Sequence, residues 1–260
     1  MVSSSVFIRV HPWLHCFSGP VQLPSNDFDV GAVSYPNHCI NQLHSMNRIA
    51  TLALALSLLA STSFAADEAG FVPLFNGKDT TGWHLRRKDG NNTWTIENGI
   101  LKNTVPQGGH GTDLVTDKKF WNFTVRYEFQ VPDDSNSGFY LRGRHEIQIF
   151  GDFKSGKPSK TGNGAIYNHT APSAFASRPG DEWQTAEATI IGNKITVILN
   201  GKKIHDNVVC DKATGSELDN KVTEPGAMFL QGDHGTVSFR NLRIKQLPPA
   251  GPTNMRIIKE

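Results

Sequence analysis

The feature that most constrains the fold is a strict alternation of apolar and polar residues from Phe123 to Val131. Phenylalanine, valine and tyrosine occupy every second position, and polar residues fill the positions between them until Pro132 ends the run. Because successive side chains of a strand point to opposite faces, this pattern predicts a half-buried β-strand. No stretch after residue 65 shows sustained helical periodicity, so we expect a chain built from strands.

Turn signals divide the rest of the chain into short strands. Asn98-Gly99, Gly192-Asn193 and Asn200-Gly201 each separate two apolar runs, as expected for tight hairpins. Near the end of the chain the apolar positions change parity, which predicts a bulge close to Asn241. Many short strands without alternating helices favour two packed antiparallel sheets, in an all-β sandwich or jelly roll.

Two long connections are predicted between these strands. Residues 103–119 and 151–181 are rich in glycine, proline, serine and lysine. Loops of this length in a compact domain commonly line a binding site. We expect Trp83 to be a core anchor rather than a platform for stacking a sugar ring.

The first quarter of the chain reads as a targeting segment. Met46, Asn47 and Arg48 precede an apolar run over 49–60 and small residues near Ala65. This order is typical of a secretory signal peptide over 46–65, and the run is too short to span a membrane. We therefore expect an exported protein, periplasmic or secreted, with no membrane span in its mature part.

Residues 1–45 do not fit such a targeting segment, because a signal peptide is read at the start of a chain. We expect that translation begins at Met46 and that 1–45 are a spurious or disordered extension. The histidines and cysteines of this extension match no metal-ligand spacing. The predicted domain then covers 66–247, and residues 248–260 form a proline-containing tail.

Composition excludes several classes of protein. The chain has 26 Lys and Arg against 24 Asp and Glu, a net charge of +2, which argues against a nucleic-acid partner. Cys210 is the single cysteine after residue 65, so the mature domain cannot form an internal disulfide. Its sequence neighbourhood indicates a structural role rather than a nucleophile.

One predicted strand, over 142–149, carries a polar face. Arg142, Arg144, Glu146 and Gln148 alternate with residues that include Ile147 and Ile149. Two arginines, a carboxylate and an amide on one surface suit a polyhydroxylated ligand such as a sugar. A solvated sheet face is the alternative interpretation.

The second candidate is the Asp233–His234 pair, which lies between Gly232 and Gly235. Flanking glycines allow the backbone to approach a ligand, and histidine is the side chain best matched to proton transfer near neutral pH. A surface turn is the alternative. An ordinary retaining glycosidase would need two carboxylates about 5 Å apart, and Asp152 is the possible partner of Glu146.

Nine short motifs occur in an order that resembles the 3-keto-disaccharide hydrolase domain family, over residues 70–247. They are Phe71–Asp79 with Gly82-Trp83, Trp94 with Glu97–Gly99, Asn136–Arg142, Glu146–Ile149, Gly164–Tyr167, Glu182–Thr185, Leu199–Gly201, Gln231–Gly235 and Phe239–Ile244.

This resemblance implies a concanavalin-like jelly roll that cleaves glycosides oxidised to a ketone at C3 of the sugar. The ketone acidifies the hydrogen at C2, so a base could remove it, the C1 substituent could leave, and water could add afterwards. Paired carboxylates are then unnecessary. The alternatives are a non-catalytic carbohydrate-binding module on the same sandwich and an ordinary glycosidase.

Our interpretation assigns a role to each candidate residue. His234 is the base or the acid for the leaving group, and Arg142 and Arg144 stabilise the enediolate oxygen. Glu146 and Gln148 hold hydroxyls or a divalent cation, for which hard oxygen ligands favour calcium, magnesium or manganese over zinc. The further residues expected to contact substrate are Asp152, Tyr167 and Asp233.

Overall fold

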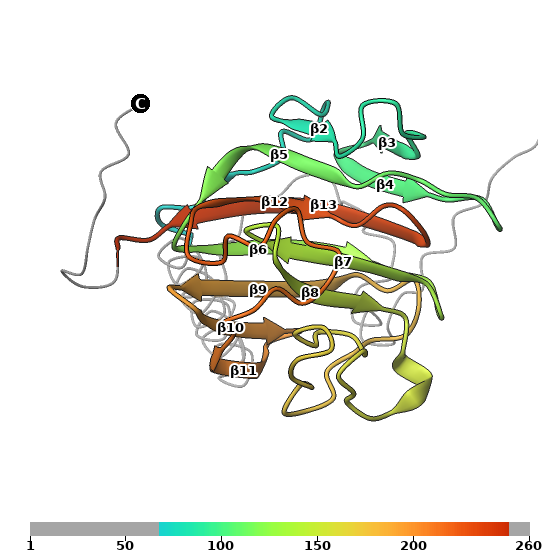
Figure 1. Ribbon diagram of the computed structural model, residues 1–260. Helices are drawn as coiled ribbons and strands as arrows, with labels where there is room; N and C mark the ends of the chain where they lie inside the picture. The colour runs from blue at the N-terminus through green and yellow to red at the C-terminus, as the bar shows by residue number, and fades with distance from the viewer. Residues whose placement is uncertain (1–67, 250–260) are drawn as a thin grey trace, which may run out of the picture. The chain divides into compact units, whose positions relative to one another are not determined.

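The computed structural model describes residues 68–249, which form two antiparallel β-sheets packed face to face (Figure 1). The predicted extension, the signal peptide and residues 250–260 of the tail lie outside the described residues. The fold is the all-β jelly-roll sandwich that the sequence predicts. Within 68–249 no helix is long and apolar enough to cross a membrane.

The larger sheet has eight strands. Its order is β11 (Lys202–Val209), β10 (Lys194–Leu199), β9 (Gln184–Ile191), β6 (Phe123–Gln130), β13 (Thr236–Gln246), β4 (Ile100–Thr104) and β3 (Trp94–Glu97), and β1 (Val72–Pro73) also pairs with β13.

The smaller sheet has five strands and carries the candidate residues. Its order is β2 (Trp83–Leu85), β5 (Leu114–Phe120), β12 (Gly226–Leu230), β7 (Asn136–Leu141) and β8 (His145–Phe150). A single turn of 3-10 helix, η1 (Phe153–Ser155), follows β8.

The core lies between the two sheets and follows the predicted alternation. Along β6, the apolar side chains are buried and the polar ones are partly exposed. Tyr127 of β6 stacks on Phe139 of β7 with ring centroids 4.4 Å apart, which joins the two layers. Trp83 is a core residue, as predicted, and its indole N–H donates to the Leu74 carbonyl oxygen at 3.0 Å. Cys210 is buried and free.

The turn chemistry read from the sequence is confirmed. Asn98 and Gly99 connect β3 to β4 with φ values of 51° and 78°. Asn200 and Gly201 connect β10 to β11 in the same left-handed region. The pairing of β13 with β6 shifts between Arg240 and Arg243, which is the predicted bulge around Asn241.

Two expectations about strand positions are wrong. The stretch 103–119, expected as a connection, contains most of β5, in which Asp117, Lys118 and Lys119 are exposed. The strand expected over 142–149 begins only at His145. Arg142 and Gly143 have φ values of 53° and 69°, so they form the tight turn of the β7–β8 hairpin.

The edge of the smaller sheet is covered by a loop. β8 is the last strand of that sheet, and residues 164–167 run along its free side. The Gln148 N–H donates to the Ala165 carbonyl oxygen at 2.9 Å, and the Tyr167 N–H donates to the Glu146 carbonyl oxygen at 3.0 Å. This segment belongs to the long 151–181 connection and therefore borders the polar residues of β8.

Candidate functional site

A row of three side chains, two of them polar, crosses the outer face of the smaller sheet. Phe229 pairs with Tyr140 and Tyr140 pairs with Glu146, so these three side chains lie on one face. Tyr140 and Phe229 stack with ring centroids 3.8 Å apart. The opposite face of the same strands carries core residues such as Phe139 and Ile147.

A second row, made of Gln148, Gly138 and Gln231, runs beside the first, and its central residue has no side chain. Gly138 pairs with Gln148 on β8, and on its other side it accepts the Gln231 N–H at 2.9 Å. A Cβ atom at position 138 would lie 2.3 Å from Glu146 Oε1. A side chain at this position would displace the Glu146 carboxyl group, which occupies the space above Gly138.

Glu146 is a buried carboxyl group with an unusual proton affinity. Its side chain accepts a hydrogen bond from the Tyr140 hydroxyl at 2.7 Å. Burial raises the pKa of Glu146 to about 7, and the charges of Asp233 and Asp113 add to this, against the lowering effects of Tyr140 and His234. Glu146 can therefore exchange a proton at neutral pH.

Asp233 and His234 lie in the turn between β12 and β13. His234 Nδ1 lies 2.7 Å from Asp233 Oδ1. This contact raises the pKa of His234 and lowers the pKa of Asp233. The turn packs closely on Trp94, since a Cβ atom at Gly232 would lie 2.6 Å from the indole ring.

Asn136 connects the turn to β8. Its side-chain Nδ2 lies 2.9 Å from His234 Nε2, and its Oδ1 accepts a hydrogen bond from Gln148 Nε2 at 3.0 Å. Glu146 and His234 also each affect the pKa of the other. The structure therefore brings together four of the predicted residues, Glu146, Gln148, Asp233 and His234.

Arg142 and Arg144 are not part of this cluster, which corrects the expectation that they share a face with Glu146. The Arg142 guanidinium donates to the carbonyl oxygens of Trp121 at 2.6 Å and Gly192 at 2.7 Å, and it stacks over the Trp121 ring. Arg144 pairs with Asp219 at 2.6 Å. The hairpin turn interrupts the strand alternation, so both side chains leave the polar face.

Asp152 and Tyr167 occupy different positions relative to the cluster. The Asp152 carboxylate accepts the Asn163 N–H at 2.9 Å and the Ser177 hydroxyl at 2.6 Å, so both oxygens organise the 151–181 connection. Asp152 is thus not a second carboxylate paired with Glu146. Tyr167 lies beside Glu146 at the sheet edge through its backbone N–H.

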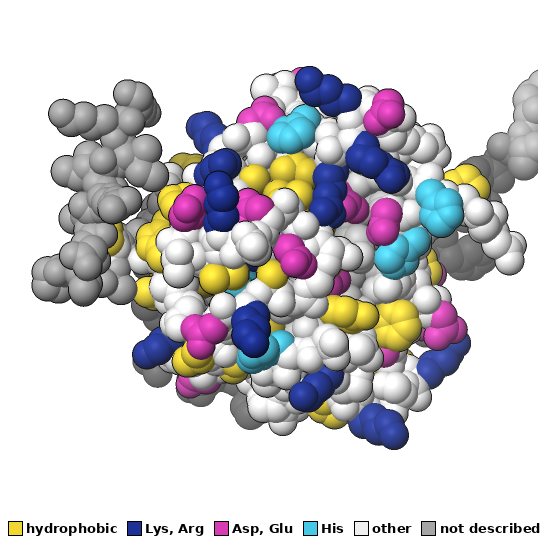
Figure 2. Space-filling model, viewed as in Figure 1, with side chains coloured by type: hydrophobic (Ala, Val, Ile, Leu, Met, Phe, Trp, Pro, Cys, Tyr) yellow, Lys and Arg dark blue, Asp and Glu magenta, His cyan; other side chains and the backbone are white. Residues whose placement is uncertain are grey.

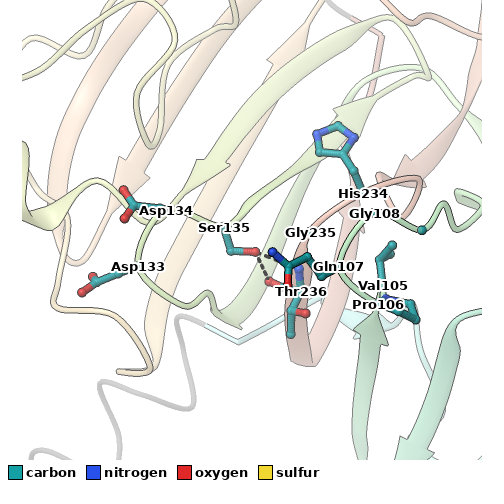
Figure 3. A pocket seen from close by; sticks show the side chains of 11 residues that line it. Val105, Pro106, Gln107, Gly108, Asp133, Asp134, Ser135, His234, Gly235 and Thr236 are labelled. Carbon is teal, nitrogen blue, oxygen red and sulfur yellow. Dashed lines mark hydrogen bonds between the residues drawn. The ribbon is translucent and has the colours of Figure 1, made fainter.

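A pocket of about 610 Å³ borders the cluster. Figure 3 shows Asp133 and Asp134 on one side of it and His234, Val105 and Pro106 on the other. Ser135 and Thr236 are joined by two hydrogen bonds at its base. His234 is one of the residues that line the pocket, whereas Glu146 and Gln148 are not.

Two amide oxygens of the second row have no hydrogen-bond partner. Gln148 Oε1 and Gln231 Oε1 are buried and unpaired, on either side of Gly138. Buried polar atoms are normally paired, so these two acceptors suit the hydroxyl groups of a ligand. The described residues contain no group of three or more His, Cys, Asp or Glu side chains arranged to hold a metal ion.

Charged side chains of both signs are mixed on one face of the molecule (Figure 2). Figure 2 shows basic and acidic side chains interspersed around apolar ones, with no field of a single sign on the face in view.

Sequence reasoning missed Tyr140, Asn136 and Gln231. The signal that could have found Tyr140 is the Arg142-Gly143 pair. A hairpin turn at that pair places Tyr140 opposite Glu146. Asn136 has the same parity as Tyr140 on β7 and could have been found by the same step.

One family model and one named relative match this chain. The model of the 3-keto-alpha-glucoside-1,2-lyase-like domain matches residues 70–245. A 3-keto-disaccharide hydrolase from Bacteroides thetaiotaomicron is 27% identical over 246 residues, covering 75% of this chain and 84% of that protein.

Two crystal structures from Parabacteroides distasonis, both of candidate glycosyl hydrolases, share the fold. The first is 27% identical with a TM-score of 0.54, covering 69% of this chain and 84% of the other. The second is 22% identical with a TM-score of 0.55, covering 69% and 95%.

Proposed function

The chain belongs to the family of 3-keto-alpha-glucoside-1,2-lyase-like domains, and from this premise we propose that it cleaves the glycosidic bond of 3-keto-glycosides, including 3-keto-disaccharides. The named relative from Bacteroides thetaiotaomicron supports this substrate class. The reaction is an elimination followed by addition of water, so its net outcome is hydrolysis.

The observation that carries the proposal is the pairing of one buried carboxyl group with one histidine. Glu146 has a pKa of about 7, its charge and that of His234 each shift the pKa of the other, and Asp152 is engaged elsewhere. Hydrolysis of an unoxidised glycoside would need two carboxylates with separate tasks. Elimination beside a ketone needs a base and an acid, and no carboxylate nucleophile.

The first half of the reaction removes the C2 hydrogen. The substrate displaces the Asn136 NH₂ group from His234 Nε2, and Nε2 then takes the C2 proton. The electron pair of the C2–H bond forms the enediolate with the C3 ketone. The enediolate then reforms the ketone, makes a C1–C2 double bond and expels the C1 oxygen. That oxygen takes the proton of the Glu146 carboxyl group, which its raised pKa keeps available at neutral pH.

The second half adds water to the double bond. The Glu146 carboxylate takes a proton from water while the oxygen bonds to C1, and the His234 imidazolium returns its proton to C2. Both residues end in their starting states. Gln148 Oε1 accepts a substrate hydroxyl, and Tyr167 and Asp233 border the sugar in this proposal.

Stabilisation of the enediolate oxygen is not assigned to Arg142 or Arg144, since their guanidinium groups contact the backbone and Asp219. We also propose that the protein is exported, to the periplasm or the medium. The N-terminus of the exported product should then be Ala66, which a mass measurement would test.

The test of the function compares two chromogenic substrates. The protein is expected to release nitrophenol from 4-nitrophenyl 3-keto-glucoside and to leave 4-nitrophenyl glucoside intact. In D₂O the sugar product should carry deuterium at C2, because the C2 proton is exchanged. Comparable cleavage of the unoxidised glycoside would refute the elimination, and binding without turnover would instead support a carbohydrate-binding module. A parallel assay with a chelator tests the divalent cation expected at Glu146 and Gln148.

A further inference from the structure

The hydrogen-bond chain behind His234 begins at a backbone carbonyl group. Gln148 Nε2 donates to the Thr161 carbonyl oxygen at 3.2 Å and to Asn136 Oδ1 at 3.0 Å. A carbonyl oxygen can only accept, so the Gln148 amide must turn its NH₂ group towards Thr161. This contact fixes which way the Gln148 amide points.

The orientation of Gln148 determines that of Asn136. The atom of Asn136 that meets the Gln148 NH₂ group must be an acceptor, and it is therefore the carbonyl oxygen. The Asn136 NH₂ group is then directed to His234 Nε2, 2.9 Å away. An NH₂ group can only donate, so Nε2 must accept.

The other ring nitrogen faces a carboxylate. His234 Nδ1 lies 2.7 Å from Asp233 Oδ1, which is an acceptor. This contact lies at an ion-pair distance without the geometry of a hydrogen bond, but the carboxylate still favours a proton on Nδ1. The hydrogen bond at Nε2 then determines which nitrogen of neutral His234 carries the proton. We propose that Gln148 and Asn136 are positioning residues that hold neutral His234 with its proton on Nδ1 and with the unprotonated Nε2 accepting the Asn136 N–H.

Three nearby carboxylates oppose the effect of the two amides, because they favour protonation of His234. Asp233 on its own turn, Asp113 before β5 and Glu146 on β8 all favour a protonated ring. A proton on Nε2 would place two donors, the Nε2–H and the Asn136 NH₂ group, against each other. The Asn136 amide cannot flip to relieve this contact while its oxygen accepts from Gln148. The amide pair therefore limits the rise in the pKa of His234 that the three carboxylates cause.

The catalytic meaning of this arrangement rests on the proposed function, because a base must be unprotonated at the atom that receives the proton. The tautomer itself is independent of any activity. Gln148 contributes by orienting Asn136 and is not a proton carrier.

The test is a ¹⁵N NMR titration of the full domain with labelled histidine, in which the spectrum of His234→Gln assigns the signal. In the wild-type protein, neutral His234 should carry its proton on Nδ1. Gln148→Met frees Asn136 to turn over, so the pKa of His234 should rise by about half to one unit. Gln231→Met is the matched control, since it removes a buried amide on the other side of Gly138 and should leave the pKa of His234 unchanged.

A double-mutant cycle separates this device from a general loss of structure. Asn136→Ala should also raise the pKa of His234, and adding Gln148→Met should then have no further effect, because Gln148 acts through Asn136. A wild-type ring protonated on Nε2, or additive effects of the two substitutions, would overturn the proposal. If the protein fails to cleave 3-keto substrates but shows this tautomer, the proposed function fails and the inference stands.

Discussion

The turn of the β7–β8 hairpin and the strand that follows it both carry buried polar residues, but these residues differ in their hydrogen bonds. In the turn, Arg142 and Arg144 donate to backbone carbonyl oxygens and to Asp219, and their side chains are fully buried. Along β8, beyond the turn, Glu146 has a shifted pKa and Gln148 retains an unpaired oxygen. Saturated contacts indicate a structural role, whereas unpaired acceptors and shifted proton affinities indicate a site for a ligand.

The same contrast applies to the histidines near this hairpin. His145 on β8 points to the core, lies 3.4 Å from the Cys210 sulfur atom, and burial lowers its pKa to about 4. It therefore stays neutral at physiological pH. His234 is half-exposed, faces the pocket and has a raised pKa. Accessibility and the direction of the pKa shift separate the candidate base from the structural histidine.

The largest effect should come from His234→Ala in the candidate site. Removing the base should lower kcat/KM for 4-nitrophenyl 3-keto-glucoside by about 10³-fold, within the usual range for general base catalysis. Deuterium exchange at C2 should fall in parallel. Stability should change little, because 43% of the His234 side chain is exposed. An unaltered exchange rate would exclude His234 as the base.

Arg142→Leu tests the turn. It leaves the carbonyl oxygens of Trp121 and Gly192 without their donor, so the free energy of unfolding should fall by about 2–4 kcal/mol. Urea denaturation would measure this loss. The kcat/KM of the folded variant should stay within about threefold of wild type. A hundredfold loss of activity without a loss of stability would show that Arg142 acts in the site and not in the fold.

Glu146→Gln should affect substrates according to their leaving group. An alkyl alcohol needs a proton to depart, so cleavage of a 3-keto-disaccharide should fall by about 10²-fold. Nitrophenol departs without one and should be released almost normally. Equal losses on both substrates would argue against Glu146 as the acid.

The same substitution has a predictable effect on stability. The folded pKa of Glu146, about 7, lies above the ordinary value of 4.5. Its contribution to stability is therefore fully present below about pH 4.5 and is lost as pH rises through 7. Urea unfolding from pH 5 to 8 should show the wild type losing stability relative to Glu146→Gln. A constant difference between the two proteins would contradict the raised pKa.

Tyr140→Phe should have the smallest effect. The Tyr140 hydroxyl lowers the pKa of Glu146 by a hydrogen bond, so its removal should raise that pKa further. The alkaline limb of the kcat/KM profile, which reports the protonated acid, should move to higher pH by about half a unit. A shift to lower pH would show that the hydroxyl does not stabilise the carboxylate.

The sequence predicted those parts of the fold that depend on local rules. The alternation of Phe123–Val131, the Asn98-Gly99 turn and the bulge at Asn241 each follow from backbone geometry and burial, and the structure has all three. The sequence also pointed to Glu146, Gln148, Asp233 and His234 as candidates. Their proximity depends on Asn136 and on packing of the turn against Trp94, which are contacts between distant segments.

The failed prediction at Arg142 and Arg144 has a specific cause. Alternation along a strand holds only while the strand continues, and an Arg-Gly pair with positive φ was not recognised as a turn. The run of alternating residues was therefore extended by three positions. In the same way, the exposed lysines of β5 made a strand look like a loop.

The segment over 164–167 has a consequence for solubility. A terminal β-strand exposes unpaired N–H and C=O groups that can recruit a strand from another molecule and start aggregation. The N–H groups of Gly164 and Tyr167 donate to β8, and the Ala165 carbonyl oxygen accepts from it, which satisfies these groups along the strand. This cover keeps the strand that carries Glu146 and Gln148 from becoming a template for intermolecular assembly.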